Sequence, residues 1–397
     1  MKTAFYVHVP FCLRRCTYCD FNTYAGLLEL RAAYVAALER ELARWAAEHP
    51  ELEAATLYFG GGTPSLLTPE QVQAVIAAVQ RRFALPEGAE VTLEANPGAV
   101  TRSSLEGLRR SGVNRLSLGV QSADAAELRL LGRIHTWEEA VAAVRGARQA
   151  GFDNLSLDLI FGLPGQTLSR WEQTLARALA LEPEHLSLYA LTLEPETLLA
   201  ERVARGELPE PDPDLAAEMY ERASQCLLKA GFWQYEISNW ARGAASAQLL
   251  WALPPGGRSE GCSPWVSHHN LAYWRMEPWL GVGAGAYSYL PGSRRRNLPH
   301  PADYIAALQA GRSCQADVEP ISRALALGET LMMGLRLAEG VTDARFRARC
   351  GAGLEAVYGE VLARFAALEL LEWDGRRVRL TARGRLLGNQ VFGAFLL

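Results

Sequence analysis

Three cysteines near the start of the chain have a spacing that suits metal or redox chemistry. Cys12, Cys16 and Cys19 form a C-x3-C-x2-C pattern directly after a short hydrophobic run, YVHVPF. Thiolates are soft ligands that favour iron–sulfur clusters, copper(I) or zinc. A structural zinc site needs four ligands, usually in two pairs, whereas the other four cysteines are scattered singly downstream. A [4Fe–4S] cluster takes one thiolate per iron, so three thiolates leave one iron open to a substrate or cofactor.

Composition limits the classes of protein to which the chain can belong. It has 397 residues, of which 49% are hydrophobic and 21% charged, enough for a sizeable core in two or three domains. A net charge of -4 gives no electrostatic footprint for a nucleic-acid partner. Disulfides are a poor explanation for seven cysteines, an odd number without a secretion signal. Since no apolar run is long enough to span a bilayer, we expect a soluble cytoplasmic protein without a transmembrane segment.

Strand-like and helical segments alternate through the first half of the chain. Runs rich in strand-forming residues lie at 4–9, 56–59, 91–95, 115–120, 155–161 and 186–191. Helical patterns lie between them at 28–48, 69–83, 136–150 and 168–181, and another follows at about 214–230. Six strand–helix units in series predict an α/β fold with a parallel sheet and its helices outside. We expect a partial (β/α)6 TIM-like barrel, with a doubly wound sheet as the alternative.

Polar or glycine-rich motifs follow the strand-like runs. The cysteine loop follows the first run, GGGTPS (60–65) the second, EANPG (94–98) the third and GVQS (119–122) the fourth. Asp158 lies in the fifth run, ahead of FGLPG. The carboxyl ends of parallel strands meet on one rim of a barrel, where ligands bind. These motifs therefore predict a single active-site face.

The second half of the chain has a different pattern. We expect the barrel to occupy residues 1–231 and an irregular, aromatic-rich connection that contains HNLAYW to occupy residues 232–301. Residues 243–265 within it are rich in Gly, Ala, Ser and Pro, which is typical of an irregular insertion. Residues 302–397 return to helical patterns and include Asp374-Gly375 between alternating runs, a hairpin signal. This predicts a C-terminal, mainly helical domain that resembles a winged helix.

The cysteine pattern and the rim motifs together resemble a known superfamily. C-x3-C-x2-C after the first strand of a partial barrel is similar to the signature of radical S-adenosylmethionine (SAM) proteins. In that superfamily the open iron of a [4Fe–4S] cluster binds SAM, and an electron from the cluster cleaves SAM to a 5′-deoxyadenosyl radical. YVHVPFC, GGGTPS, EANPG, GVQS and DLIFGLPGQT further resemble the oxygen-independent coproporphyrinogen III oxidase-like family. YEISNWA, HNLAYW, GVGAGAYSYL and TARGRLLGNQVFGAFL are similar to its HemW-type haem chaperone branch.

The resemblance implies roles for individual residues. Cys12, Cys16 and Cys19 would ligate the cluster. Residues 61–63 would meet the methionine end of SAM, where glycine lets the backbone approach a ligand closely. The positions that match SAM-contacting residues of the relatives are Tyr6, Tyr18, Gly61, Gly62, Thr63, Glu94, Gln121, Arg133, Asp158 and Ala190. Ordinary packing is the alternative for the tyrosines and the alanine, and a helix cap or ion pair is the alternative for a single carboxylate.

Two functions within this family remain open. One is an oxidase that decarboxylates coproporphyrinogen III to protoporphyrinogen IX, and the other is a chaperone that binds haem and delivers it to haem-requiring proteins. The oxidases extend the motif to C-x3-C-x2-C-x-C, whereas this chain has Phe21 at the last position. HNLAYW resembles the HNxxYW element associated with haem binding, and histidine is a common axial ligand of haem iron. Both features favour the chaperone and make His269 its expected haem ligand.

Three departures from the relatives bear on the haem assignment. The insertion at 243–265 lies between YEISNWA and HNLAYW, where the relatives are shorter. Tyr287 stands where relatives often have histidine. Cys262 lies in the insertion, where a buried or idle thiol is the preferred interpretation and a rival haem ligand is the alternative. Relatives can associate as dimers, so the resemblance leaves a homodimer open.

Overall fold

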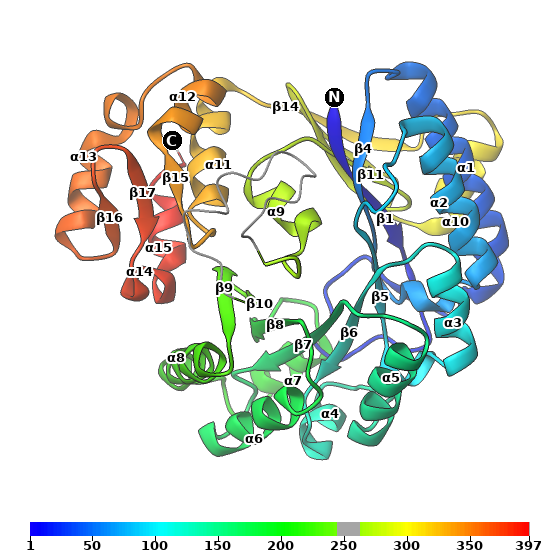
Figure 1. The fold of residues 1–397 in the computed structure, drawn as a ribbon, viewed down its shortest axis with the longest axis horizontal. Coiled ribbons are helices and arrows are strands. Elements are labelled where there is room, and N and C mark those ends of the chain that lie inside the picture. Colours follow the sequence, from blue (N-terminus) through cyan, green and yellow to red (C-terminus); the bar gives the residue numbers. More distant parts are fainter. Residues whose placement is uncertain (244–262, 397) are drawn as a thin grey trace.

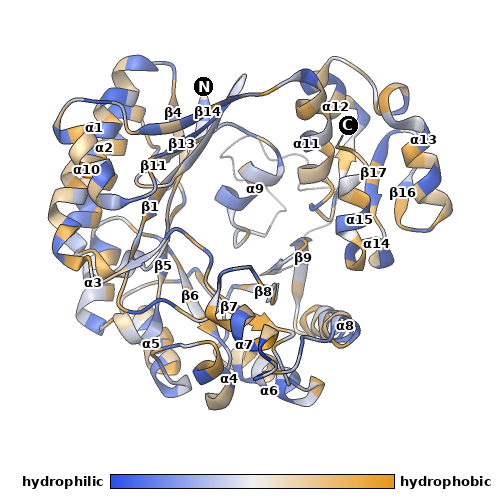
Figure 2. Cartoon of the chain, turned by 180° about the vertical axis from the view of Figure 1, so that it is seen from behind, coloured by the Kyte–Doolittle hydropathy of each residue, from blue (hydrophilic) through white to orange (hydrophobic). Residues whose placement is uncertain are grey.

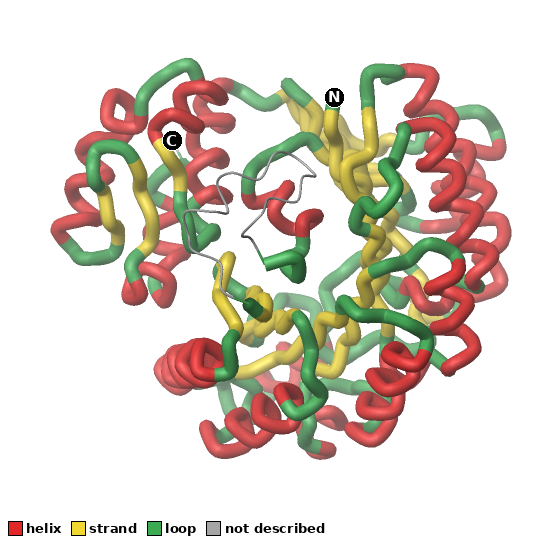
Figure 3. Tube along the Cα trace, in the orientation of Figure 1, coloured by secondary structure: helices red, strands yellow, loops and turns green. Residues whose placement is uncertain are grey.

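The structure, a computed structural model, describes residues 1–243 and 263–396 and is built around one curved sheet (Figure 1). Six strands form its centre, and each neighbouring pair among them is parallel. Helices line the outside of the curve and strands form its inner wall (Figure 3). In order across the sheet, the six strands are β1 (Lys2–Val9), β4 (Glu53–Gly61), β5 (Val91–Ala95), β6 (Arg115–Gln121), β7 (Leu155–Phe161) and β8 (His185–Ala190). This confirms the partial barrel of six strand–helix units.

Alternation of side chains gives these strands an apolar outer face and a polar inner face. In β1, Phe5 and Val7 join the main hydrophobic core, which the strands share with the surrounding helices. Tyr6 lies on the other face, because successive side chains of a strand point to opposite sides. By the same rule Glu94 in β5 and Asp158 in β7 face the inside. The interior of a TIM-type barrel is usually filled by branched apolar side chains, so a polar interior suits a ligand here.

The outer helices are amphipathic, and all of them except α1 (Arg31–Glu48) begin at a side-chain cap. Thr68 and Thr136 each form a capping box with the residue three positions later, which satisfies free N–H groups of the first turn. Hydrophobic and hydrophilic segments alternate along these helices (Figure 2). They are α1 (Arg31–Glu48), α2 (Pro69–Phe83), α3 (Arg102–Arg110), α4 (Ala125–Leu130), α5 (Trp137–Gln149), α6 (Leu168–Leu179), α7 (Leu198–Ala204) and α8 (Pro213–Lys229). The predicted helices match the observed ones within a few residues, whereas α3, α4 and α7 were not predicted.

The segment expected to be an irregular connection, 232–301, extends the sheet at both edges instead. One edge gains β10 (Asn239–Arg242) and β9 (Phe232–Glu236), which continue from β8. The other gains β11 (Trp279–Val282), β12 (Tyr287–Leu290), β13 (Ser293–Asn297) and β14 (Gln315–Pro320), with β11 parallel to β1. A short helix, α9 (His268–Trp274), lies on the inner side of the curve. The expected insertion at 243–265, with Cys262, lies almost entirely outside the described residues.

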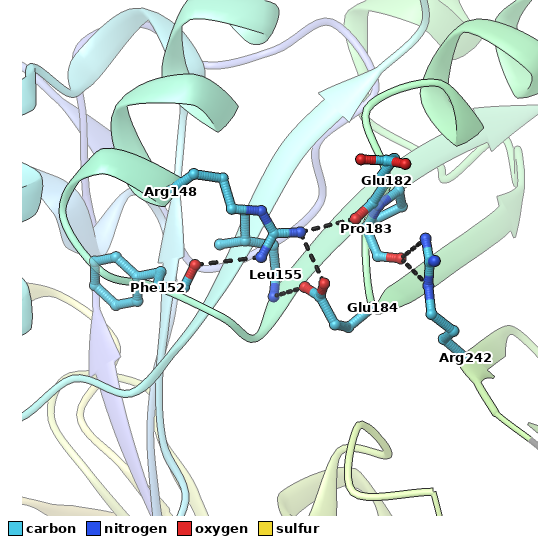
Figure 4. A network of polar contacts seen from close by, with 7 residues as sticks. All are labelled: Arg148, Phe152, Leu155, Glu182, Pro183, Glu184 and Arg242. Carbon is cyan, nitrogen blue, oxygen red and sulfur yellow. Dashed lines mark hydrogen bonds and ion pairs between the residues drawn. The ribbon is translucent and has the colours of Figure 1, made fainter.

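A polar network fixes the edge of the barrel near the start of β8 (Figure 4). Arg148, at the end of α5, forms an ion pair with Glu184 at 2.8 Å, and Glu184 also accepts from the N–H of Leu155 at 3.0 Å. Arg242 of β10 donates to the carbonyl of Pro183 at 3.0 Å. These bonds tie a helix and two strands to the loop that enters β8.

The C-terminal part has a hydrophobic core of its own, and it begins later than expected. Tyr304 of α10 (Pro301–Gln309) packs in the barrel core, whereas the second core starts at Leu327. Its elements are α11 (Arg323–Gly334), α12 (Asp343–Cys350), α13 (Leu354–Ala367), α14 (Ala382–Leu386), α15 (Gly388–Gly393), β15 (Val341–Thr342), β16 (Leu371–Trp373) and β17 (Arg377–Leu380). Pairing of β16 with β17 confirms the hairpin at Asp374-Gly375. No helix in the described part of the chain has both the length and the hydropathy needed to span a bilayer.

Candidate functional site

The three cysteines lie in a loop that leaves the end of β1. Cys12 belongs to the two-residue strand β2 (Phe11–Cys12), which pairs with β3 (Tyr24–Ala25) and so closes the loop on its own start. The N–H of Thr17 donates to the carbonyl of Leu131 at 3.1 Å, and its hydroxyl donates to that of Leu130 at 2.8 Å. These bonds hold the loop against the C-terminal end of α4.

Each thiol has a polar neighbour. The pairs are Thr63 Oγ1 with Cys12 Sγ at 3.6 Å, Arg133 Nη1 with Cys16 Sγ at 3.3 Å, and Thr23 Oγ1 with Cys19 Sγ at 3.8 Å. The thiolate is the form of cysteine that binds metal. Burial raises the pKa of the Cys12 thiol, and a bound metal is the stronger force that deprotonates such a group.

The donor set fits a cluster better than a single ion. Within residues 1–243 and 263–396, no three His, Cys, Asp or Glu side chains are arranged to hold one metal ion. A [4Fe–4S] cluster requires no such convergence, because each thiolate binds a separate iron. All three cysteines instead line one cavity of about 360 Å³ inside the barrel.

This cavity gathers most of the residues expected to contact SAM. The loop after β1 contributes one side of its lining, and most of the rest comes from β4 to β8 and the segments that follow them. Asn270 of α9 also contributes. The expected residues that line it are Tyr18, Gly61, Gly62, Thr63, Glu94, Gln121, Arg133, Asp158 and Ala190. Tyr6 and His269 are not in its lining. The predicted rim is thus one continuous site.

Gly61 and Gly62 allow β4 to pack closely against the cysteine strand. Gly61 has a φ of +111°, and a Cβ there would lie 2.5 Å from the ring of His8. A Cβ on Gly62 would lie 2.7 Å from the carbonyl oxygen of Phe11. The N–H of Thr63 donates to that same carbonyl at 2.8 Å. The glycines therefore position the residues beside Cys12 and leave backbone exposed to the cavity.

Two half-buried carboxylates, on β5 and β7, line the cavity. Glu94 accepts from the hydroxyl of Tyr58 at 2.8 Å and from the N–H of Gly61 at 3.2 Å, yet burial raises its pKa to about 7. Asp158 accepts from the hydroxyl of Ser117 at 2.9 Å, and burial raises its pKa as well. Carboxylates in these positions can bind hydroxyl groups or a cationic group of a ligand. The positive charge of such a ligand would favour the ionised form of Glu94 and Asp158.

A backbone irregularity at the end of β6 shapes the wall next to Cys16. Gln121 has a φ of +67°, and the pairing of β6 with β7 shifts register between Gly119 and Gln121. Arg133 donates to the carbonyl of Gly119 at 2.8 Å, and a Cβ on Gly119 would lie 3.2 Å from the guanidinium. Strained backbone of this kind is often found at functional sites. Here it directs an amide and a guanidinium to the cavity.

The two tyrosines differ in their positions. Tyr18 lines the cavity, as does the guanidinium of Arg133, whose charge acts against the rise that burial causes in the pKa of Tyr18. Tyr6 does not line the cavity. Its hydroxyl is hydrogen bonded to His8 Nδ1 at 3.1 Å, and its ring stacks on that of Tyr58, a lining residue, with centroids 6.2 Å apart. A direct contact with a ligand in the cavity is therefore open to Tyr18, whereas Tyr6 supports the wall.

His269 is completely buried, and both ring nitrogens are hydrogen bonded. Nδ1 lies 2.8 Å from Thr56 Oγ1 and Nε2 lies 2.9 Å from the hydroxyl of Tyr273. The ring stacks on Tyr58 with centroids 4.9 Å apart. Burial lowers the pKa of His269 to about 4, so the imidazole is neutral at physiological pH. In this arrangement His269 holds α9 against the barrel.

Two charged residues near the site, Arg115 and Glu90, were not predicted from the sequence. Arg115, only 2% exposed, lines the cavity at the start of β6. Glu90 accepts from the backbone N–H groups of His268 and His269 at 2.8 and 3.1 Å, where an acidic group stabilises a helix N-terminus. Burial acts to raise the pKa of Glu90, but Arg115 and these bonds hold it below its usual value. The one available signal was the polar position of Arg115 at the start of a hydrophobic strand.

Comparison with known proteins assigns the class. A profile of the Radical SAM superfamily matches residues 6–178, and one of the HemN C-terminal domain matches residues 321–387. The fold is that of the Escherichia coli coproporphyrinogen III oxidase HemN, with a TM-score of 0.83 over 100% of this chain and 90% of that chain, at 23% identity. Fold and site together define a radical SAM protein. Membership of that superfamily implies a [4Fe–4S] cluster and SAM.

Relatives that match the whole chain narrow the assignment. The Bacillus subtilis heme chaperone HemW is 36% identical over 100% of this chain and 99% of its own length. The Mycobacterium tuberculosis H37Rv heme chaperone HemW is 37% identical over 98% of this chain and 94% of its own length. The mitochondrial radical S-adenosyl methionine domain-containing protein 1 of Danio rerio is 34% identical over 100% of this chain and 87% of its own length. The chain belongs to the HemW family.

Proposed function

We propose that this protein is a haem chaperone, which binds haem and delivers it to haem-requiring proteins. The observation that carries the proposal is the similarity, at 36% identity over the whole chain, to the B. subtilis heme chaperone HemW. Phe21 adds support because the oxidases of the wider family resemble this chain but have a fourth motif cysteine there. The likeness to the E. coli oxidase, at 23% identity, concerns the fold alone.

The barrel cavity would hold the cluster and SAM in this proposal. Cys12, Cys16 and Cys19 would each ligate one iron, and Arg133 would stabilise the charge at Cys16. Glu94 and Asp158 would bind hydroxyl or cationic groups of SAM through their carboxylates. Together the bound groups supply one-electron chemistry. The protein would hold and orient them through the side chains that line the cavity.

His269 remains the haem ligand that we propose, and its ligation requires a movement of α9. Coordination through Nε2 would replace the bond to Tyr273 and withdraw the ring from its stack on Tyr58. The neutral imidazole is already the form that coordinates iron. Asn270, the next residue of α9, lines the cavity, so the helix borders the site before any movement.

An anaerobic haem titration of the cluster-reconstituted protein, followed through the Soret absorption, tests the proposal. We expect saturable binding of about one haem per chain. His269→Ala should weaken this binding or change the spectrum, whereas His49→Ala, at the end of α1, should do neither. Wild-type spectra in His269→Ala would remove His269 as the ligand. No saturable binding by the wild type would sink the proposal, and the decarboxylation of coproporphyrinogen III would then be assayed.

A further inference from the structure

Two aromatic rings in the lining of the barrel cavity are exposed. We call the exposed part of this lining the mouth of the cavity, which consists of Arg14, Arg15, Asp20, Phe21, Tyr189, Ala190 and Thr192. Phe21, just after the third motif cysteine, is 63% exposed, and Tyr189, near the end of β8, is 43% exposed. Both line the cavity that holds the three thiols. A chain with a core of this size has room to bury such rings. Exposed apolar rings that share one cavity therefore indicate a surface for an apolar ligand.

Two adjacent arginines lie at the same mouth. Arg14 and Arg15, in the cysteine loop, are exposed and line the cavity. Neither has a hydrogen bond or ion pair with another residue in the described part of the chain. Arg133, deeper in the cavity, is by contrast held by Cys16 and Gly119. The charges of Arg14 and Arg15 are thus available to a ligand.

We propose that haem lies across this mouth, with its macrocycle against Phe21 and Tyr189 and its two propionates on Arg14 and Arg15. The inference rests on the proposed haem-binding function and names the residues that hold the cargo. Haem is a flat apolar ring with two neighbouring carboxylates. Aromatic faces stack on such a ring, and guanidinium groups form strong, geometrically defined bonds with carboxylates. The four side chains supply both kinds of contact at one opening.

The mouth is accessible without any movement of α9. His269 is 0% exposed in this conformation, whereas Arg14, Arg15 and Phe21 are exposed. Haem can therefore reach the mouth first, next to the cavity wall to which Asn270 of α9 contributes. The mouth site accounts for capture, and His269 would act only after α9 opens.

Acidic neighbours narrow the class of ligand. Asp20 and Glu194 also line the cavity, and their charges oppose those of the arginines. A small anion such as phosphate gains nothing from Phe21 and Tyr189 and is repelled by these carboxylates. A ligand that has both carboxylates and a large apolar face gains contacts with Phe21 and Tyr189 in addition to its ion pairs with Arg14 and Arg15. This balance selects an amphipathic macrocycle over a simple anion.

Paired variants test the mouth site in anaerobic haem titrations of the reconstituted protein. Arg14→Ala/Arg15→Ala should weaken haem binding by about five- to thirtyfold, as expected for two partly solvated charge pairs. Arg81→Ala/Arg82→Ala removes two adjacent exposed arginines from the end of α2 and should change nothing. Phe21→Ala should lower the haem affinity about three- to tenfold. Leu228→Ala, which truncates a side chain that is 69% exposed on α8, should leave the haem affinity unchanged.

Esterified haem separates the charge contribution from general damage. Haem dimethyl ester, which lacks the propionate charges, should bind the wild type more weakly than haem and should bind Arg14→Ala/Arg15→Ala no worse than the wild type. Arg14→Lys/Arg15→Lys should keep most of the haem affinity, and equal iron content in all variants would show that the cluster is intact. Saturable wild-type binding with no loss in the arginine and Phe21 variants would overturn the mouth site alone. An absence of wild-type binding would instead refute the proposed function.

Discussion

At the residue scale, burial and charge compete at Glu94. Its carboxylate is needed in ionised form for a cationic group, yet burial raises its pKa to about 7. The bonds from Tyr58 and Gly61 offset only part of the cost of burial. Without a ligand, the carboxyl is therefore partly protonated at neutral pH.

This shift predicts a pH-dependent difference in stability between the wild type and Glu94→Gln. The pKa of Glu94 rises on folding from 4.5 to about 7, so the folded state binds this proton more tightly than the unfolded state. The resulting contribution to folding stability is fully present below about pH 4.5 and is lost as the pH rises through 7. We therefore compare the free energy of unfolding of Glu94→Gln with that of the wild type. Between pH 4.5 and pH values above 7, this difference should change by up to about 3 kcal/mol in favour of the variant. Urea unfolding of the SAM-free protein at several pH values measures this, with the exposed Glu29→Gln as control. A pH-independent difference would contradict the assigned pKa.

The site residues differ in how far the sequence could specify them. Positions in the rim motifs, such as Glu94 and Gln121, follow strands whose carboxyl ends must meet, so their convergence could be predicted. The bond of Glu90 to the start of α9 could not, because it joins segments far apart in the chain. The burial of His269 could not either, since it depends on Thr56 and Tyr58 of β4. Periodicity indicates the face of a strand but does not identify the partner.

At the element scale, strand length decided what could be predicted from sequence. The six central strands are apolar runs bounded by turn residues and separated by helices, a pattern that periodicity reveals. β10, β11 and β12 have four residues each, too few to establish a period. β11 is a strand because it pairs with β1, a contact that the local sequence does not encode. The edges of the sheet are therefore a tertiary feature.

The close contact between β4 and β1 predicts that Gly61 tolerates no side chain. Gly61→Ala would place a Cβ 2.5 Å from the His8 ring at a φ of +111°, which we expect to cost about 3 kcal/mol or more and to reduce the iron content. Gly88→Ala is the matched control, with a φ of +76° and no atom within 4 Å of the new Cβ. Gly88→Ala should lower the free energy of unfolding by about 1 kcal/mol, because alanine is disfavoured at a positive φ. Equal losses in urea unfolding would show that the contact with His8 is unimportant.

At the scale of the whole molecule, the C-terminal part braces α9 against the barrel. Arg275, which ends α9, lies 3.5 Å from the buried carboxylate of Glu339, and Arg345 donates to the carbonyl of Arg275 at 2.6 Å. Arg336 lies over the ring of Trp274 at 5.2 Å. The helix that contains His269 thus contacts both parts of the chain. Any release of α9 from the barrel would therefore also involve its contacts with the C-terminal part.

The central claim, delivery of haem, is tested most directly by transfer. The haem-loaded protein is mixed anaerobically with a haem-requiring acceptor that has been prepared without its haem, and the Soret spectrum and acceptor activity are followed. Haem-loaded serum albumin serves as the control donor, and an excess of a haem-scavenging protein traps haem that dissociates into solution. We expect transfer whose rate rises with the donor concentration and is little affected by the scavenger, because haem passes within a complex. Transfer that the scavenger abolishes, at the rate seen with albumin, would contradict the chaperone function.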